Sequence, residues 1–214
     1  MSKPAKSPGE LTTPAARPPR RARGQLRVDA LLASAAEVFA AKGFESATMT
    51  EIAAQADSSI GSLYQFFRTK ETVAAALLAA QVQALWLRFD ELAACAPSLP
   101  IAGLGRELAL LLVGFREAHP SFARLIEAPG VPAPVVGGMR VQMRERLAAI
   151  LRERAPELDA ATLAAITPVV QQAMKAGVQL QAEFSGPERD AALLELQHLL
   201  AGYLEARLGA ARVR

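Results

Sequence analysis

The sequence predicts an all-α protein of about nine helices. Alanine and leucine dominate a chain that is 51% hydrophobic but only 5% aromatic, and runs of β-branched residues are absent. Alanine and leucine favour helices, whereas strands favour β-branched and aromatic residues. Apolar residues recur every three or four positions between glycine and proline breaks. The 214 residues can bury a core, as one domain or as a small domain joined to a larger one.

Residues 1–23 are expected to form a disordered basic arm. Lysines and arginines face a single acidic residue there, Glu10, and Pro14, Pro18 and Pro19 interrupt any helix or strand. A basic segment of this kind suggests contact with phosphates, and the strength of such contact falls steeply with salt. A solubilising tail is the alternative interpretation.

The first helix is expected from about residue 24 to 42. Leu31, Ala35 and Phe39 form its apolar stripe, and Gly43 is placed to end it in a left-handed conformation. After this glycine, Phe44 can pack back onto the short helices that follow.

Two short helical patterns flank a polar turn between residues 47 and 71. Thr48 and Ser59 occupy the positions of their N-caps, and Asp57 and Ser58 lie in the turn between them. Each segment alone is too short to be a stable helix. Two such helices joined by a tight turn form a helix-turn-helix, whose second helix can lie in a DNA major groove.

A long helix should follow, capped by Thr69 and stopped before Pro97. It is too long to belong only to the DNA-reading unit, so it could transmit motion from the rest of the chain. Further helices are expected over about 101–118, from 120, and over about 135–154, 160–184 and 187–208, with a proline-rich loop at 128–134.

Several classes of protein are disfavoured. The lone Cys95 cannot form an intramolecular disulfide, and no Cys/His cluster has metal-ligand spacing, so neither metal nor cofactor is expected. His119 and His198 lie far apart without a nucleophile, which argues against an enzyme. No apolar run approaches the roughly 20 residues of a membrane span, and a signal peptide is not evident. These observations predict a cytoplasmic protein with no membrane partner.

The segment from Leu31 to Leu78 resembles the N-terminal domain of TetR-family transcriptional regulators. The positions that carry the resemblance are Ala35, Phe39, Gly43, Phe44, Thr48, Ile52, Ala53, Ala56, Ser59, Gly61, Leu63, Tyr64, Phe67, Lys70 and Glu71. Members usually carry Gly-Val where this chain has Asp57 and Ser58. The resemblance implies a helix-turn-helix DNA-binding domain at 24–69 and a helical ligand-binding and dimerisation domain at 70–214.

The candidate DNA-binding residues lie on the two short helices and at the start of the long one. They are Thr48, Thr50, Ser59, Ile60, Gly61, Ser62, Tyr64, Gln65 and Lys70. Gln65 is the best candidate for base recognition, because a glutamine amide can pair bidentately with adenine; a solvated surface glutamine is the alternative. Tyr64 and Lys70 would, by resemblance, contact phosphates, which positions a protein without choosing sequence. Leu63 and Phe67 are assigned to the core.

Two sets of residues in the C-terminal half are candidates for binding. An aromatic and thioether set suits an apolar or aromatic effector, with simple core as the alternative: Trp86, Phe89, Phe115, Phe122, Met139, Met143 and Met174. The last two helices carry a stripe that could form a four-helix dimer interface or an intramolecular core: Val170, Ala173, Gly177, Leu193, Leu196, Leu200, Tyr203 and Leu204, together with Val169.

Together these features predict a homodimeric repressor on a palindromic operator, with its recognition helices in successive major grooves about 34–36 Å apart. A small apolar or aromatic effector would release it from double-stranded DNA. The alternative is a TetR-like DNA-binding protein controlled by a protein partner, with no small-molecule ligand.

Overall fold

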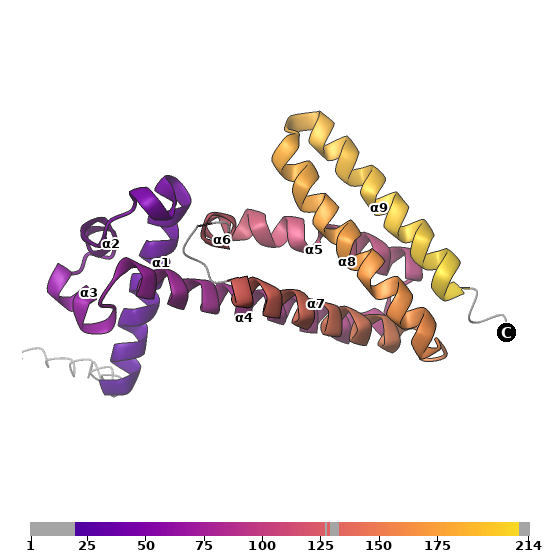
Figure 1. Ribbon diagram of the computed structural model, residues 1–214, viewed down its shortest axis with the longest axis horizontal. Helices are drawn as coiled ribbons and strands as arrows, with labels where there is room; N and C mark the ends of the chain where they lie inside the picture. Colours follow the sequence, from indigo (N-terminus) through magenta and orange to yellow (C-terminus); the bar gives the residue numbers. More distant parts are fainter. Residues whose placement is uncertain (1–19, 127, 129–132, 210–214) are drawn as a thin grey trace, which may run out of the picture.

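The structure is a computed structural model that describes residues 20–126, 128 and 133–209 (Figure 1). Over these residues it is all-α, as predicted, with nine α-helices, one short 3-10 helix and no strand. The elements are α1 Arg20–Ser46, α2 Met49–Gln55, α3 Ile60–Phe66, α4 Lys70–Cys95, η1 Ala96–Ser98, α5 Ile101–Ala118, α6 Pro120–Ile126, α7 Ala133–Arg154, α8 Ala160–Glu183 and α9 Gly186–Gly209.

The first helix begins at Arg20, earlier than the expected start near Gly24. Arg20 directly follows the last proline of the N-terminal segment, and the arginines and alanine of 20–23 are strong helix formers. Residues 20–23 of the predicted arm are therefore helical. Residues 1–19 of that arm, and 127 and 129–132 of the predicted loop, lie outside the described part of the chain.

Gly43 interrupts α1 near its end. Its φ of 75° and ψ of 175° belong to a backbone region that is essentially restricted to glycine. The chain then turns so that the Phe44 ring lies 6.0 Å from the Phe39 ring, centroid to centroid. Lys70 Nζ lies 4.6 Å from the centroid of the Phe44 ring and donates a 2.9 Å hydrogen bond to the Glu45 carbonyl. Lys70 therefore fastens the end of α1 to the start of α4.

Two hydrophobic cores organise the described helices. The N-terminal core joins α1, α2, α3 and the start of α4, around buried Phe39, Ile52 and Leu63. The C-terminal core joins α4 to α5, α7, α8 and α9, around buried Phe89, Leu108 and Ile150. In Figure 1 the first three helices gather at one end of the molecule, α4 and α7 run alongside each other, and α8 and α9 form a hairpin at the other end.

The short helix α6 contributes to both cores. Its Leu125 is buried in the N-terminal core, three positions after Phe122, which is buried in the C-terminal core. Positions three apart on a helix point in broadly the same direction, so α6 lies across the junction of the two cores. A buried hydrogen bond of 2.7 Å from Gln81 Nε2 on α4 to the Ser121 hydroxyl also joins α4 to α6.

One described segment, Lys70–Ser98, is long and apolar enough by length and composition to cross a membrane. The expectation that no run approaches this length was therefore wrong for α4. Val73, Leu85 and Phe89 along this helix are buried within the protein, as in the core helix of a folded domain. Packing in the protein interior thus accounts for part of the apolar composition of α4.

Candidate DNA-binding surface and ligand cavities

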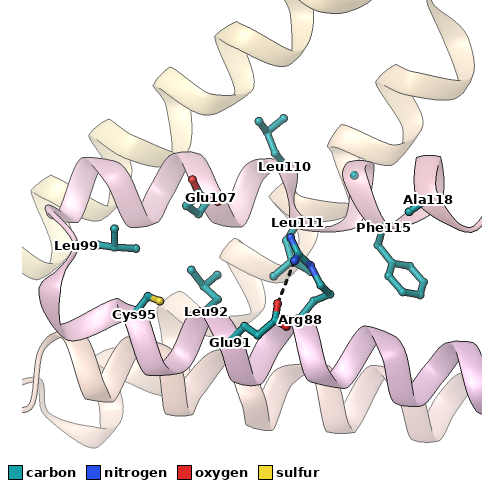
Figure 2. Close-up of a pocket in the computed structure, with 11 residues that line it drawn as sticks. Arg88, Glu91, Leu92, Cys95, Leu99, Glu107, Leu110, Leu111, Phe115 and Ala118 are labelled. Atoms are coloured by element: carbon teal, nitrogen blue, oxygen red, sulfur yellow. Dashed lines mark hydrogen bonds and ion pairs between the residues drawn. The ribbon is translucent and has the colours of Figure 1, made fainter. Parts of the chain in front are cut away.

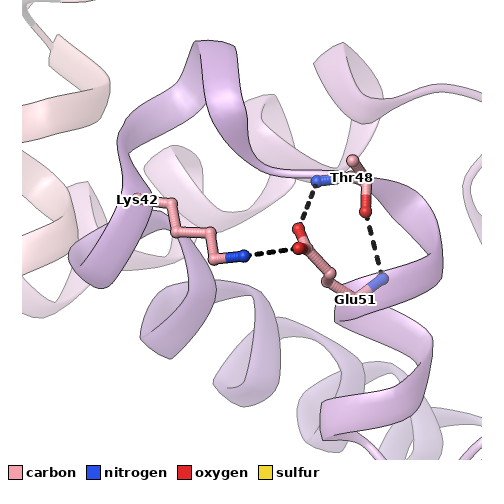
Figure 3. Close-up of polar contacts among 3 residues, drawn as sticks. All are labelled: Lys42, Thr48 and Glu51. Carbon is pink, nitrogen blue, oxygen red and sulfur yellow. Dashed lines mark hydrogen bonds and ion pairs between the residues drawn. The ribbon is translucent and has the colours of Figure 1, made fainter.

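The N-terminus of α2 is fixed by a capping box that includes a third residue from α1 (Figure 3). The Thr48 hydroxyl accepts a hydrogen bond from the Glu51 backbone N–H, and Glu51 Oε2 accepts one of 3.1 Å from the Thr48 N–H. Lys42 donates to the other carboxylate oxygen of Glu51. The hydrogen bonds from Lys42 and Thr48 lower the pKa of Glu51 below its ordinary value of 4.5. The predicted cap is confirmed.

The turn between α2 and α3 is a Schellman motif. The Ser58 N–H donates to the Ala53 carbonyl at 2.9 Å and the Asp57 N–H to the Ala54 carbonyl at 3.1 Å, which satisfies the free carbonyls at the end of α2. Asp57 has a φ of 45°, the left-handed conformation that this motif requires and that glycine adopts most easily. The Ser58 hydroxyl is buried without a hydrogen-bond partner.

The outer face of α3 is exposed at its N-terminal end. Ser59 caps the helix by accepting a 3.2 Å hydrogen bond from the Ser62 N–H. Ile60 and Tyr64 are 39% and 50% exposed, Gln65 is also exposed, and a Cβ on Gly61 would meet no atom within 4 Å. Leu63 and Phe67 are buried, as predicted. An exposed face at the start of a short second helix is the geometry that enters a major groove.

Three predicted DNA-contacting side chains make hydrogen bonds inside the protein. The Thr48 and Ser59 hydroxyls accept capping hydrogen bonds, and Lys70 binds the Glu45 carbonyl while keeping further N–H donors. The Ser62 hydroxyl is covered by protein atoms and has no hydrogen-bond partner within the described part of the chain, so its contact with DNA stays a prediction. Thr50 is exposed in the first turn of α2.

Arg68 is a candidate that the sequence analysis missed. It follows α3 directly, its side chain is exposed, and a cation at this position can contact a phosphate. The signal available in the sequence was its position between the end of α3 and the Thr69 cap. That position alone does not separate it from an ordinary surface arginine.

A cavity of about 410 Å³ opens between α5, α6, α7 and α8. We call it the cationic cavity, because its described lining includes Arg116, Arg140 and Lys175 and no carboxylate. The remaining lining residues are Leu85, Leu112, Phe115, Phe122, Ile126, Met139, Met143, Val178 and Gln179. Its volume lies within the range of small-molecule sites. Four of the seven predicted pocket residues therefore lie together in one cavity.

The other three predicted pocket residues do not line this cavity. Trp86, Phe89 and Met174 are almost completely buried in the C-terminal core. The Trp86 and Phe89 rings pack edge to face at 5.8 Å, and the Arg146 guanidinium lies 5.2 Å from the Trp86 ring centroid. These three side chains form simple core, which was the alternative interpretation.

A second, larger hollow of about 750 Å³ lies between α4 and α5 (Figure 2). We call it the α4–α5 groove. Glu91 in its lining is paired with Arg88 at 3.0 Å, and Glu107 adds a second carboxylate. Phe115 lines both hollows. The groove was not predicted, because its lining mixes charged and apolar residues without a sequence pattern.

The predicted dimer stripe lies inside the monomer. Val170, Leu200 and Leu204 are completely buried in the C-terminal core, so they have no surface left for a partner. Gly177, Leu193 and Leu196 are also buried, and Ala173 and Tyr203 are partly buried against the same core. The intramolecular alternative therefore describes this stripe. Val169 on α8 and Leu194 and Leu199 on α9 are instead exposed.

Comparisons with known proteins agree with this architecture. The family description "Bacterial regulatory proteins, tetR family" matches residues 31–77, and "Tetracyclin repressor-like, C-terminal domain" matches residues 100–204. A comparison with curated proteins found no match.

Solved structures share the fold along most of the chain. A TetR-like transcriptional regulator from Rhodococcus sp. RHA1 is 26% identical, with a TM-score of 0.57 over 86% of this chain and 96% of that one. A TerR/AcrR-family regulator from Aquifex aeolicus VF5 is 16% identical, with a TM-score of 0.60 over 84% and 98%. The fatty acid degradation regulator FadR from Bacillus halodurans is 17% identical, with a TM-score of 0.57 over 82% and 94%.

The DNA-binding segment and the helical C-terminal domain are each matched by a TetR-type family description, and the helix-turn-helix leads into α4 as the resemblance implied. The chain belongs to the TetR family of helix-turn-helix transcriptional regulators.

Proposed function

We propose that the protein is a homodimeric repressor that binds a palindromic operator through α3 and leaves it when a small molecule binds in the cationic cavity. It acts in the cytoplasm, by binding rather than by catalysis. The observation that carries this proposal is the exposed face of α3, which holds Gly61, Tyr64 and Gln65 above the buried Leu63 and Phe67. A rigid helix with an exposed N-terminal face is suited to recognise base edges and phosphates.

The proposed contacts to DNA are of two chemical types, contacts to bases and contacts to phosphates. Gln65 has an amide that can pair with adenine, and Gly61 lets the backbone approach the DNA closely because no side chain intervenes. Tyr64 and Thr50 have hydroxyls, and Arg68 a guanidinium, that can bind phosphate oxygens. The phosphate contacts would set the position of α3 in the groove, and Gln65 would choose among sequences.

The dimer would form through the outer face of α8 and α9. Val169, Leu194 and Leu199 are 49%, 48% and 61% exposed on these adjacent helices. Exposed Ala165 and Gly202 would allow helix backbones to approach closely. Exposed apolar side chains on two adjacent helices can pair with their own copy across a two-fold axis, which is the commonest symmetry of protein oligomers. Two α3 helices would then meet the two halves of a palindrome.

Helix α6 offers a direct connection from the cavity to the DNA-binding domain. Phe122 and Ile126 line the cationic cavity, and Leu125 between them is buried in the N-terminal core. The amide of Gln81 on α4 binds Ser121 on α6, while its oxygen is buried without a partner. An effector that prefers a shifted α6 would draw the population away from the DNA-competent conformation. This connection is shorter than the α4 route suggested by the sequence alone.

Control by a protein partner remains the alternative function. The cavity of about 410 Å³ favours a small molecule, because a concave, mostly apolar lining with a few charged groups is typical of small-molecule sites. A protein partner would instead need an exposed face beyond the one proposed for dimerisation.

The test is binding of the purified protein to the DNA upstream of its own gene, measured by electrophoretic mobility shift. A shuffled fragment of equal length and composition is the control. We expect binding that prefers the natural fragment and weakens steeply with salt, and that falls when extracted small-molecule pools are added. Equal binding to both fragments would overturn the proposed function.

A further inference from the structure

The lining of the cationic cavity combines two chemical types of side chain. Phe115 and Phe122 pack edge to face at 5.2 Å, and buried Met139 and Met143 extend the same apolar wall. The lining also holds two positively charged side chains, the half-buried Lys175 of α8 and the exposed Arg140 of α7. A neutral apolar ligand would use only the first of these two types of side chain.

Lys175 lies near other positive charges, Arg140 and Arg144. Lys175 makes no hydrogen bond or ion pair within the described part of the chain. Partial burial, and then repulsion from Arg140 and Arg144, lower the pKa of Lys175 below its ordinary value. Like charges at this spacing disfavour the charged form, and a bound anion would relieve that cost.

A buried amide, that of Gln171, lies next to these cations and connects α7 to α8. Gln171 is completely buried one turn before Lys175 on α8. Its Nε2 donates to the Arg140 carbonyl at 2.9 Å, and its Oε1 accepts from Arg144 Nε at 3.3 Å. Gln171 therefore links α8 to α7 next to the two cavity cations, Lys175 and Arg140. Fixing the helices that carry these cations reduces the ordering cost of binding an anion.

Two described acidic side chains near the cavity in sequence, Glu117 and Glu145, are not part of its lining. Glu117 of α5 accepts a 2.9 Å hydrogen bond from Gln181, and Glu145 of α7 is exposed outside the cavity lining. The α4–α5 groove has the opposite character, because Glu91 and Glu107 outnumber Arg88 there. The two hollows would therefore select ligands of opposite charge.

We propose that the effector of the cationic cavity is an anionic amphiphile, a carboxylate on an aliphatic or aromatic body. The carboxylate binds Lys175 and Arg140, and the apolar body packs on Phe115, Phe122 and the two methionines. This proposal rests on the proposed function, since it names the ligand class of the same regulator. It narrows the sequence prediction of an apolar or aromatic effector by adding a required negative charge.

The experiment compares ligands that differ only in their head group. Octanoate, octanol and octylamine form one series, and 4-phenylbutyrate and 4-phenylbutanol form an aromatic pair. Binding is measured by isothermal titration calorimetry on the full chain without DNA. We expect at least one carboxylate to bind about tenfold or more tightly than its alcohol, as a hydrogen bond to a charged group implies. Equal or weaker binding by both carboxylates, or a preference for octylamine, would overturn the proposal.

Two variants test whether Lys175 binds the carboxylate of the ligand. Lys175→Gln should reduce carboxylate affinity about tenfold and leave alcohol affinity unchanged, whereas Arg152→Gln, an exposed arginine of α7 outside the cavity, should change neither. Because Lys175→Gln removes a repelled charge, the melting temperature of the free protein should not fall. A loss of affinity for both ligand types in Lys175→Gln would indicate a distorted cavity and would contradict the assigned role.

The failure of this proposal is distinguishable from failure of the proposed function. Selective operator binding that carboxylates do not reverse, with no binding in the calorimeter, would refute the anionic effector alone. Carboxylate binding in the calorimeter without selective DNA binding would refute the repressor and leave the ligand class standing.

Discussion

Gly105 on α5 lies directly against the backbone of Ala201 on α9. A Cβ atom on Gly105 would lie 2.6 Å from the Ala201 Cα and 2.7 Å from its backbone nitrogen. Backbone atoms cannot move aside as a flexible side chain can, so the close approach of α5 and α9 depends on a hydrogen at this position. Gly177 on α8 is a milder case, with the nearest atoms at 3.0 Å.

Gly105→Ala should therefore destabilise the protein by about 3 kcal/mol, because the added methyl group forces α5 and α9 apart. Gly114→Ala is the matched control on the same helix, where a Cβ would meet no atom within 4 Å. That change should be neutral or stabilise by up to about 1 kcal/mol, since alanine favours helices. Urea unfolding followed by circular dichroism measures both. Similar stabilities for the two variants would refute the close contact.

Two adjacent serines should respond to alanine in opposite directions. Ser58→Ala removes a buried hydroxyl without a partner and should stabilise the protein by about 1 kcal/mol. Ser59→Ala removes the cap of α3 and should cost about 1 kcal/mol. Thermal unfolding of the two variants checks the signs. A loss of stability in Ser58→Ala would mean that its hydroxyl does find a partner in solution.

The capping box should make part of the stability depend on pH. The hydrogen bonds from Lys42 and Thr48 lower the pKa of Glu51 in the folded protein. Its contribution is therefore present above the unfolded pKa near 4.5 and is lost as the pH falls through the lower folded value. Glu51→Gln should destabilise the protein at pH 7, and the difference from wild type should shrink at acid pH. Urea titrations at a series of pH values measure this. A difference that is constant with pH contradicts it.

Gln65 and Arg68 should affect DNA binding differently. Gln65→Ala should cost about 1–3 kcal/mol on the operator and relax the base preference at one position of each half-site. Arg68→Ala should weaken binding on all sequences and reduce the slope of log affinity against log salt by about 1. Titration of an operator and its single-base variants at several salt concentrations separates the two. Uniform weakening by Gln65→Ala would refute its role in base recognition.

Leu199→Glu should convert the proposed dimer to a monomer, because it places a charge on the outer face of α9. Leu26→Glu on α1 is the matched control, since Leu26 and Leu199 are both 61% exposed. Sedimentation velocity measures the oligomeric state of each. A monomeric wild-type protein, or a dimer that persists in Leu199→Glu, would show that this face is not the interface.

Most helix ends were predictable from the capping residues and helix breakers next to them in the sequence. Thr48, Ser59 and Thr69 are N-caps in the structure, and each is recognised by the few residues that follow it. Leu63 and Phe67 were assignable to the core because a short helix has only one face to bury. The caps and breaks are properties of neighbouring residues, so no knowledge of the tertiary fold was needed.

Features that depend on distant segments were not predictable. The stripe through Val170 and Leu200 has the same spacing whether α5 or a second copy covers it, and α5 covers it. The cations of the cavity come from three helices, and nothing in the sequence shows that Arg140 and Lys175 meet. The sequence does not distinguish Gly105 from other helical glycines, because its requirement for glycine comes from the contact with α9.

The position of Leu125 bears on how regulators of this fold can be recombined. The predicted domain boundary falls between residues 69 and 70, but a side chain from α6 completes the N-terminal core. In a chimera that takes residues 24–69 from this chain and the remainder from a relative, the α6 of the relative would pack against the DNA-binding domain of this chain. To exchange operator specificity, the α6 residues that contact the N-terminal core must therefore be transferred together with the grafted segment.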